Sequence, residues 1–403
     1  MTEKAERFRA LHHRDFRLLW AAISFSGIGT WAHVVAQGWL MYQLTNSPLW
    51  LGYIGLVRAV PLLTFPLIGG LVADRVSRVK VLYVTQAAAM LAAAILATLA
   101  FIDAIEPWHL LGFALVTALL QAFDGPARQA ILPNMVPAES MVSAVSLNSW
   151  SFNMAMLIGP AVAGALLPLV GFTGVFALNA ISFGTVLTVL PLLHVSEGIY
   201  SVGSARQNLI EGFRYIFHAP IILPLVLMTA TVSLLGRSYA HLMPVLARDV
   251  LGLDASGMSL LYTIAGLGAV SMAAVLAGAR NLPGKGKMTF AGALGVGIFL
   301  IAFAASRNVF AAGAALFMLG ASLVIFSISA TSTLQVITPK EMQGRVMSVN
   351  QIAWQGLEYL GVLFTGALAA ALSAPPVLIA AGLIVAAVTL AIAYLRPQTL
   401  STE

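Results

Sequence analysis

Long apolar runs, separated by short polar breaks, follow one another along the whole chain. A helix that crosses the hydrocarbon core of a membrane needs about 20 consecutive apolar residues. The breaks carry turn-forming residues, as at Asn46-Ser47-Pro48 and Pro375-Pro376. The pattern predicts an all-α membrane protein with transmembrane helices at residues 16–44, 49–73, 80–102, 108–124, 143–168, 172–194, 220–246, 256–279, 288–306, 308–333, 346–371 and 374–396.

Composition agrees with a membrane protein. The chain is 60% hydrophobic and only 9% charged, with a mean hydropathy of +0.92. Soluble domains contain about 25% charged residues, so a water-soluble fold of this size is excluded. The absence of cysteine excludes disulfides and thiol chemistry. The basic residues occur singly in short breaks, which gives no reason to expect a nucleic-acid partner.

Basic residues are distributed unevenly over the two sides of the predicted helix array. With the N-terminus inside, most of the 21 lysines and arginines fall in the N-terminal tail or in inner breaks. Only Arg248 and Arg307 fall in outer breaks. Cytoplasmic loops of multi-pass proteins carry this excess of positive charge. We therefore expect both termini to lie in the cytoplasm.

Two loop-to-helix junctions have similar sequences and are separated by about half the length of the chain. Such repeats occur in duplicated transporters. Pro137-Ala138-Glu139 leads to Ser146-Leu147-Asn148, and Pro339-Lys340-Glu341 leads to Ser348-Val349-Asn350. The repeat predicts two pseudo-symmetric six-helix bundles with a pathway between them. We expect an N-terminal bundle at 1–195, a cytoplasmic linker with a short amphipathic helix at 196–219, and a C-terminal bundle at 220–403.

The loop at 70–79 reads GLVADRVSRV. It resembles the loop between helices two and three of the major facilitator superfamily, usually written G-x-L-A-D-R-x-G-R-R. The departures are Val72, Ser77 and Val79. The resemblance implies the major facilitator fold, with twelve helices in two bundles. It also implies a gating role for Gly70, Asp74, Arg75 and Arg78.

A glycine–proline motif lies in the fifth predicted helix. Gly159-Pro160 begins a segment that resembles the G-P-x-x-G-G motif of superfamily exporters that exchange substrate for protons. Small residues there allow close helix packing, and an ordinary packing seam is the alternative to a gating role. We also expect Asp124 and Arg128, at the inner end of helix four, to belong to the gate.

Two further stretches, 122–137 and 333–349, resemble loops of the branch that contains drug:proton antiporters and the enterobactin (siderophore) exporter. The resemblance implies a secondary transporter in a bacterial inner membrane. It would export a hydrophobic or amphipathic small molecule by alternating access, driven by the proton gradient, without a cofactor or metal and as a monomer. A lipid or lysolipid transporter, or an uncoupled small-molecule transporter, is the alternative within this fold.

One acidic residue, Glu358, is expected deep in a span, near the middle of helix eleven. A charge at that depth costs about 2.5–3.5 kcal/mol on insertion scales and marks a pathway or an ion pair. Helical spacing places Gln351, Trp354 and Gln355 on its face, towards the cavity. We predict that Glu358 is the proton-coupling residue. A substrate-binding acid for cationic compounds, or a structural pair with an arginine, is the alternative.

Basic side chains also lie within the predicted spans. Arg58 either pairs with Glu358 or Asp124 or binds an anionic substrate group. Arg237 and His241 share a face of helix seven and either line the cavity or extend towards the outer surface. On helix one, His33 and Gln37 share a polar stripe, which predicts either cavity lining or hydrogen-bonded packing. The remaining substrate-binding candidates are Asn148, Phe152 and Phe326.

Functions other than transport find little support in the sequence. We find no His-Glu-x-x-His metal motif, no Gly-x-Ser-x-Gly nucleophile turn and no nucleotide-binding Gly-x-x-x-x-Gly-Lys-Ser/Thr loop. An enzyme and nucleotide-driven transport are therefore not expected. A membrane sensor or scaffold is the remaining non-transport alternative, and it would need an extramembrane domain. The expected partners are a small-molecule substrate, protons and the lipid bilayer.

Overall fold

The computed structural model describes residues 8–65, 77–194, 205–278 and 284–399, and these ranges contain no β-strand. Within them, ten helices are long and apolar enough to cross a membrane by length and composition. One of the ten, Ala138–Leu192, covers 55 residues, which is far more than one span needs. Helix α3 (Pro48–Thr64) is apolar but shorter, and the rest of its predicted span lies outside the described residues.

The longest helix contains two of the predicted spans. In α7 (Met141–Val189), Gly171 has φ +62° and ψ −166°, a conformation that essentially only glycine adopts. The chain turns at this residue, so that the spans predicted at 143–168 and 172–194 are separate. With both halves of α7 and with α3 included, the described helices supply the twelve predicted spans, and the all-α prediction is confirmed.

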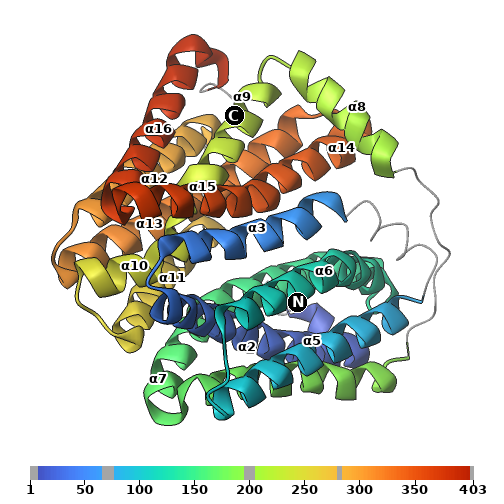
Figure 1. Cartoon of the computed structure of the whole chain (residues 1–403). Helices are drawn as coiled ribbons and strands as arrows, with labels where there is room; N and C mark the ends of the chain where they lie inside the picture. Colours follow the sequence, from blue (N-terminus) through green and yellow to red (C-terminus); the bar gives the residue numbers. More distant parts are fainter. Residues whose placement is uncertain (1–7, 66–76, 195–204, 279–283, 400–403) are drawn as a thin grey trace. The chain divides into compact units, whose positions relative to one another are not determined.

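The chain forms two compact units. The first unit contains Met1–Leu44 and Val60–Gly203. Its long helices are α2 (Arg14–Thr45), α5 (Arg78–Phe101), α6 (Pro107–Ile131) and α7, and its short 3₁₀ helices are η1 (Arg9–His12), η2 (Leu132–Asn134), η3 (Ala138–Ser140) and η4 (Leu190–Leu192). Helix α5 packs against α6 and α7 (Figure 1).

The second unit contains Thr45–Ala59 and Ser204–Glu403. Helix α12 packs against α13 and α16, and α11 packs against α13 (Figure 1). The helices of this unit are α8 (Ala205–His218), α9 (Ile222–Thr231), α10 (Tyr239–Val245), α11 (Ala255–Gly278), α12 (Lys285–Ala305), α13 (Val309–Ile337), α14 (Lys340–Gln351), α15 (Leu357–Leu372), α16 (Ala374–Leu395) and the 3₁₀ helix η8 (Pro397–Thr399).

Helix α3 contributes residues to both units. Its first part belongs to the second unit, whereas Val60 onwards belongs to the first. Pro61 lies inside the helix just after this division, where it removes a backbone hydrogen bond. The first part of α3 contacts α15 through glycines: a side chain at Gly55 would collide with Val362, and one at Gly366 would collide with Gly52. Backbones approach this closely where the residues are small.

Two of the predicted spans contain π-helical turns instead of continuous α-helix. The span predicted at 220–246 consists of α9, the π turn η5 (Val232–Gly236), α10 and the π turn η6 (Leu246–Val250). The span predicted at 346–371 consists of α14, the π turn η7 (Ile352–Gly356) and α15. A π turn changes the direction in which the following side chains point and is frequent at functional sites.

The short amphipathic helix predicted in the linker at 196–219 corresponds to helix α8. This helix packs against α14, where Glu211 and Arg345 form a 2.8 Å ion pair. Ile216 is buried in a cluster with α9, α13 and α14, whereas Phe213 and Phe217 are exposed. The helix therefore has one apolar face on the protein and exposes further apolar side chains, as an interfacial helix does.

Candidate functional site

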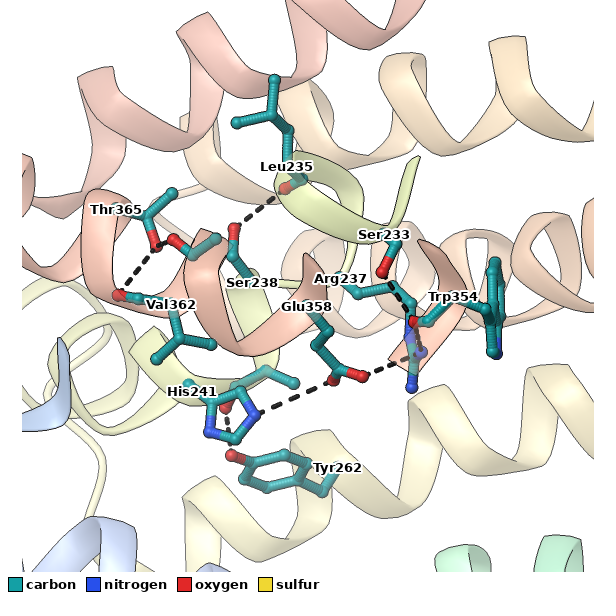
Figure 2. A network of polar contacts seen from close by, with 12 residues as sticks. Ser233, Leu235, Arg237, Ser238, His241, Tyr262, Trp354, Glu358, Val362 and Thr365 are labelled. Carbon is teal, nitrogen blue, oxygen red and sulfur yellow. Dashed lines mark hydrogen bonds and ion pairs between the residues drawn. The ribbon is translucent and has the colours of Figure 1, made fainter. Parts of the chain in front are cut away.

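A buried ion pair joins two of the predicted site residues. Arg237 Nη1 lies 2.8 Å from Glu358 Oε2, and only 13% of the Glu358 side chain is exposed. His241 Nε2 lies 3.8 Å from the other carboxylate oxygen (Figure 2). All three residues belong to the second unit. The structure thus contains the ion pair that was one of the alternatives for Glu358, but with Arg237 rather than with Arg58.

Two π turns position this pair. Arg237 directly follows η5, and Glu358 lies just after η7. The backbone carbonyl of Trp354, inside η7, accepts hydrogen bonds from the Ser233 hydroxyl at 2.6 Å and from Arg237 at 3.2 Å (Figure 2). A π turn disturbs the regular backbone hydrogen bonds, so this carbonyl is available to side chains of the neighbouring segment.

Aromatic rings surround the charged groups. The Arg237 guanidinium lies over the Trp354 ring, 4.7 Å from its centroid, and the His241 and Tyr359 rings are 5.8 Å apart. The Tyr262 hydroxyl donates a hydrogen bond to the backbone carbonyl of Ala240 (Figure 2). Rings of this kind attract cations through their faces and exclude water, which strengthens the attraction between Arg237 and Glu358.

Arg58 reaches the same region from helix α3. Its guanidinium carbon lies 5.9 Å from the centroid of the Tyr359 ring, next to Glu358 in the chain. Its charge acts on the Glu358 carboxylate. The Arg58 Nε atom is buried, and no described residue hydrogen-bonds to it. The pairing expected between Arg58 and Glu358 is not within ion-pair distance among the described residues. Asp124, the other expected partner, belongs to the first unit, where it pairs with Arg128.

A cavity of about 210 Å³ lies in the second unit, between α9, α13, α14 and η7. Most of its lining residues are polar or aromatic, and the lining consists of Thr229, Phe326, Ser327, Ala330, Thr331, Met347, Asn350, Gln351, Trp354 and Gln355. Ligand sites usually have about 300–1,000 Å³, so this cavity holds only part of a drug-sized molecule. The Phe326 and Trp354 rings, 6.1 Å apart, form its aromatic wall.

The cavity is lined by all three residues predicted to share a face with Glu358, but not by Glu358 itself. The prediction assumed an unbroken α-helix from Gln351 onwards. The π turn η7 redirects Glu358 towards Arg237 and His241, whereas Gln351 and Gln355 stay at the cavity. Thr229, Ser327 and Asn350 line the cavity without having been predicted. Thr229 and Ser327 are isolated polar residues in apolar helices, and Asn350 was noted only as part of the repeated junction.

The polar stripe predicted on helix one does not line a cavity. His33 is 1% exposed and lies between the rings of Phe113 and Phe176, at centroid distances of 4.1 and 4.5 Å. Gln37 is equally buried and donates to the Leu110 carbonyl at 2.8 Å. Both side chains are packed inside the first unit against helices that are distant in the sequence, His33 by aromatic rings and Gln37 by a hydrogen bond. This arrangement favours the packing alternative, and a role of the two residues in substrate binding stays a prediction.

Two further candidates lie on the first half of α7. Asn148 is exposed, and Phe152 is 60% exposed while its ring contacts the edge of Trp31 at 6.2 Å. On the same helix, Gly159 and Pro160 are buried, and Gly159 lies against Ile28 and Trp31 of α2. The close packing predicted there is confirmed, and the gating role stays a prediction.

The residues predicted to form the gate of the first unit make polar contacts near the start of α5 and the end of α6. Asp124 is 8% exposed and accepts hydrogen bonds from Gln86 and Thr85, at 2.8 and 3.1 Å. Arg128 Nε lies 2.6 Å from the other Asp124 oxygen. Arg78 donates to the Ala130 carbonyl at 2.7 Å. The other members of the predicted latch, Gly70, Asp74 and Arg75, lie outside the described residues.

Metal ligands do not come together in the described part of the chain: no group of three His, Cys, Asp or Glu side chains there could hold a metal ion.

Comparison with known proteins gives consistent matches. The family model described as transmembrane secretion effector, a major facilitator family, matches residues 5–402. The staphyloferrin A transporter of Staphylococcus aureus (strain NCTC 8325 / PS 47) is 28% identical over 280 residues, which is 68% of this chain and 70% of that protein. The multidrug efflux pump Tap of Mycolicibacterium fortuitum is 24% identical over 223 residues, 52% of this chain and 54% of that protein.

A solved structure shares the fold. The crystal structure of a POT family transporter in complex with 5-aminolevulinic acid has a TM-score of 0.76, at 13% sequence identity, over 96% of this chain and 96% of that chain. At this level of identity the likeness shows the fold alone. It confirms the major facilitator fold that the sequence predicted.

Proposed function

The chain belongs to the transmembrane secretion effector family of major facilitator transporters, and we propose that it exports amphipathic small molecules in a proton-coupled cycle. As a member of this family it is a multi-pass membrane transporter of small molecules and not an enzyme. The proposal adds the direction, the coupling to protons and the residue that carries the proton. The observation that carries it is the buried pair of Glu358 with Arg237.

The geometry of this pair supports a role in coupling. While Glu358 is ionised, Arg237 neutralises it within a ring-lined, poorly hydrated site. A proton on Glu358 removes this attraction and leaves the Arg237 charge uncompensated, so that the two π turns that carry these residues favour another arrangement. Protonation therefore biases a conformational equilibrium, which is what alternating access between two bundles (1–195 and 220–403) requires.

The cavity supports a substrate with an apolar body. Phe326, Trp354 and Met347 offer aromatic and thioether surface, and Gln351 and Gln355 offer hydrogen bonds. The printed names of the relatives, a staphyloferrin A transporter and a multidrug efflux pump, favour a siderophore-like or drug-like molecule for this chain. We propose residence in a bacterial inner membrane, with both termini in the cytoplasm.

Transport by purified protein in liposomes tests the proposal. Uptake into inside-out vesicles is measured for ethidium, a carboxylate siderophore and a lysophospholipid, with an acidic and with a neutral lumen. We expect at least one compound to accumulate only with the acidic lumen, and Glu358→Gln to abolish that dependence.

The matched control for this assay is Glu341→Gln, at an exposed carboxylate in the first turn of α14. It should transport like the unchanged protein. Unaltered pH-driven accumulation in Glu358→Gln would remove Glu358 from the mechanism.

A further inference from the structure

Positive charge exceeds negative charge around Glu358. Two arginines, Arg58 and Arg237, and the titratable His241 surround this carboxylate. Among the described residues, no other carboxylate lies within ion-pair distance of these three side chains. With Glu358 ionised and His241 neutral, the cluster still carries one uncompensated positive charge. Buried charges of this kind are normally paired, and they mark pathways for charged ligands.

Arg58 forms no ion pair with any carboxylate of the described residues. Arg237 already contacts the Glu358 carboxylate, the Trp354 carbonyl and the Trp354 ring. Arg58 has only the face of Tyr359, and its buried Nε has no hydrogen-bond partner among the described residues. The glycine contacts between α3 and α15 fix the position of Arg58, since Gly55 lies one turn before it and meets the Tyr359 backbone. The buried Nε donor of Arg58 is therefore held in place by the packing of α3 against α15.

We propose that Arg58, assisted by the charge of Arg237, binds an oxyanion on the transported molecule, either a carboxylate or a phosphate. A guanidinium offers several donors in a plane that matches such a group. One anion neutralises the excess charge of the cluster. The inference rests on the proposed export function and deepens it: the substrate is an amphipathic anion rather than a cation.

The proposal makes anion binding dependent on the protonation of Glu358. The groups that face this carboxylate from α3, η5, α10, α11 and α15 are Arg58, Arg237, His241, Tyr239, Tyr262 and Tyr359. An ionised Glu358 repels the bound anion and competes with it for the charges of Arg58 and Arg237. A proton on Glu358 removes both effects, so that the proton and the anion strengthen each other's binding.

Three matched probes separate charge recognition from apolar binding. Equilibrium dialysis of the full-length protein in detergent measures the affinity for 1-naphthoate, neutral 1-naphthamide and cationic 1-naphthylmethylammonium. We expect 1-naphthoate to bind most tightly. Arg58→Gln should weaken the affinity for 1-naphthoate about tenfold or more, which is the usual effect of losing a charged hydrogen bond. It should leave the affinity for 1-naphthamide unchanged. Arg58→Lys should retain part of the affinity.

Arg307→Gln is the control, since Arg307 is exposed and contacts only backbone carbonyls of its own turn. An equal loss for all three probes in Arg58→Gln would mean that Arg58 only holds α3, and would overturn the proposal. Tighter binding of 1-naphthylmethylammonium than of 1-naphthoate by the unchanged protein would overturn the proposal as well. Binding of lysophosphatidylglycerol, measured in the same way, distinguishes a lipid phosphate from a soluble carboxylate as the anion.

The Glu358→Gln variant supplies a second, independent test, because a structural defect cannot imitate its result. Glutamine resembles the protonated acid, so this variant should bind 1-naphthoate more tightly than the unchanged protein at neutral pH, and with less dependence on pH. Weaker binding would contradict the proposal. Because dialysis requires no transport, a failure of proton-driven flux would leave this result standing, and the two proposals can fail separately.

Discussion

The Ser233 hydroxyl donates a 2.6 Å hydrogen bond to the backbone carbonyl of Trp354, although the two residues are 121 positions apart in the chain. Each residue lies inside a π turn, Ser233 in η5 and Trp354 in η7. The bond therefore connects the two irregular segments that carry Arg237 and Glu358. A side chain of one segment thus hydrogen-bonds to the backbone of the other, and this bond keeps Arg237 and Glu358 side by side.

Replacing this hydroxyl should weaken the fold slightly. Ser233→Ala removes one interhelical hydrogen bond, and such bonds contribute about 0.6 kcal/mol on average and up to about 1.7 kcal/mol in membrane proteins. We expect a loss of this size in the free energy of unfolding, measured by denaturation in mixed micelles. Ser306→Ala, whose hydroxyl bonds only to Ala302 at an exposed helix end, serves as the control and should lose nothing measurable. An equal loss in both variants would contradict the prediction.

The ion pair should behave as a coupled unit. Arg237→Gln leaves the Glu358 carboxylate buried without its main cation, and breaking such a pair typically costs about 3–5 kcal/mol. The double variant Arg237→Gln/Glu358→Gln removes both charges. We expect it to be more stable than Arg237→Gln alone, in a double-mutant cycle of unfolding free energies. Strict additivity of the two single effects would show that the pair contributes nothing.

Close packing between α2 and α7 should make Gly159 intolerant of a side chain. A Cβ atom there would collide with Trp31 Cβ and would lie 2.9 Å from the Ile28 carbonyl oxygen. We expect Gly159→Ala to lower the melting temperature and the yield of folded protein. Gly112→Ala is the matched control in a membrane helix, because nothing lies within 4 Å of its Cβ position. Equal behaviour of the two variants would contradict the packing argument.

Asp124 should stabilise the first unit through its charge. Asp124→Asn removes the ion pair with Arg128 and weakens the bonds from Thr85 and Gln86. Hydrogen bonds to charged groups contribute about 1.5–3 kcal/mol, and we expect an unfolding free energy lower by about this amount.

The control for Asp124 is Asp103→Asn. Asp103 is exposed and has φ +53°, which asparagine tolerates equally well. If the loss at Asp124 were no larger than at Asp103, the buried network would have no role in stability.

The spans could be predicted from sequence because membrane thickness fixes the length of an apolar run, and glycine in such a run marks a turn. The spans predicted at 143–168 and 172–194 leave a break that contains Gly171, where the chain turns. The pairing of Arg237 with Glu358 could not be predicted, because it depends on π turns for which no sequence signal is known. Helical spacing therefore placed Glu358 on the cavity side, where Gln351 and Gln355 remain.

Polar residues in spans were harder to interpret than charged ones. His33 and Gln37 form a polar stripe by spacing, but the His33 ring stacks against aromatic rings and the Gln37 amide hydrogen-bonds to a backbone carbonyl, both from other helices. Whether a histidine faces a cavity or a packed interior depends on residues that lie far away in the chain. The cost of burying a full charge is larger, so Arg58 and Glu358 could be singled out reliably, although not their partners.

Helix α3 limits how the molecule can rearrange. One uninterrupted helix is shared by the two compact units, with glycine contacts to α15 on one side of the division and Pro61 on the other. Within the second unit, these glycine contacts hold the first part of α3 against α15, and the proline beyond them is the point at which the helix can bend. Separating α3 from α15 would part close backbones at the glycine positions and would withdraw Arg58 from Tyr359 in the same movement.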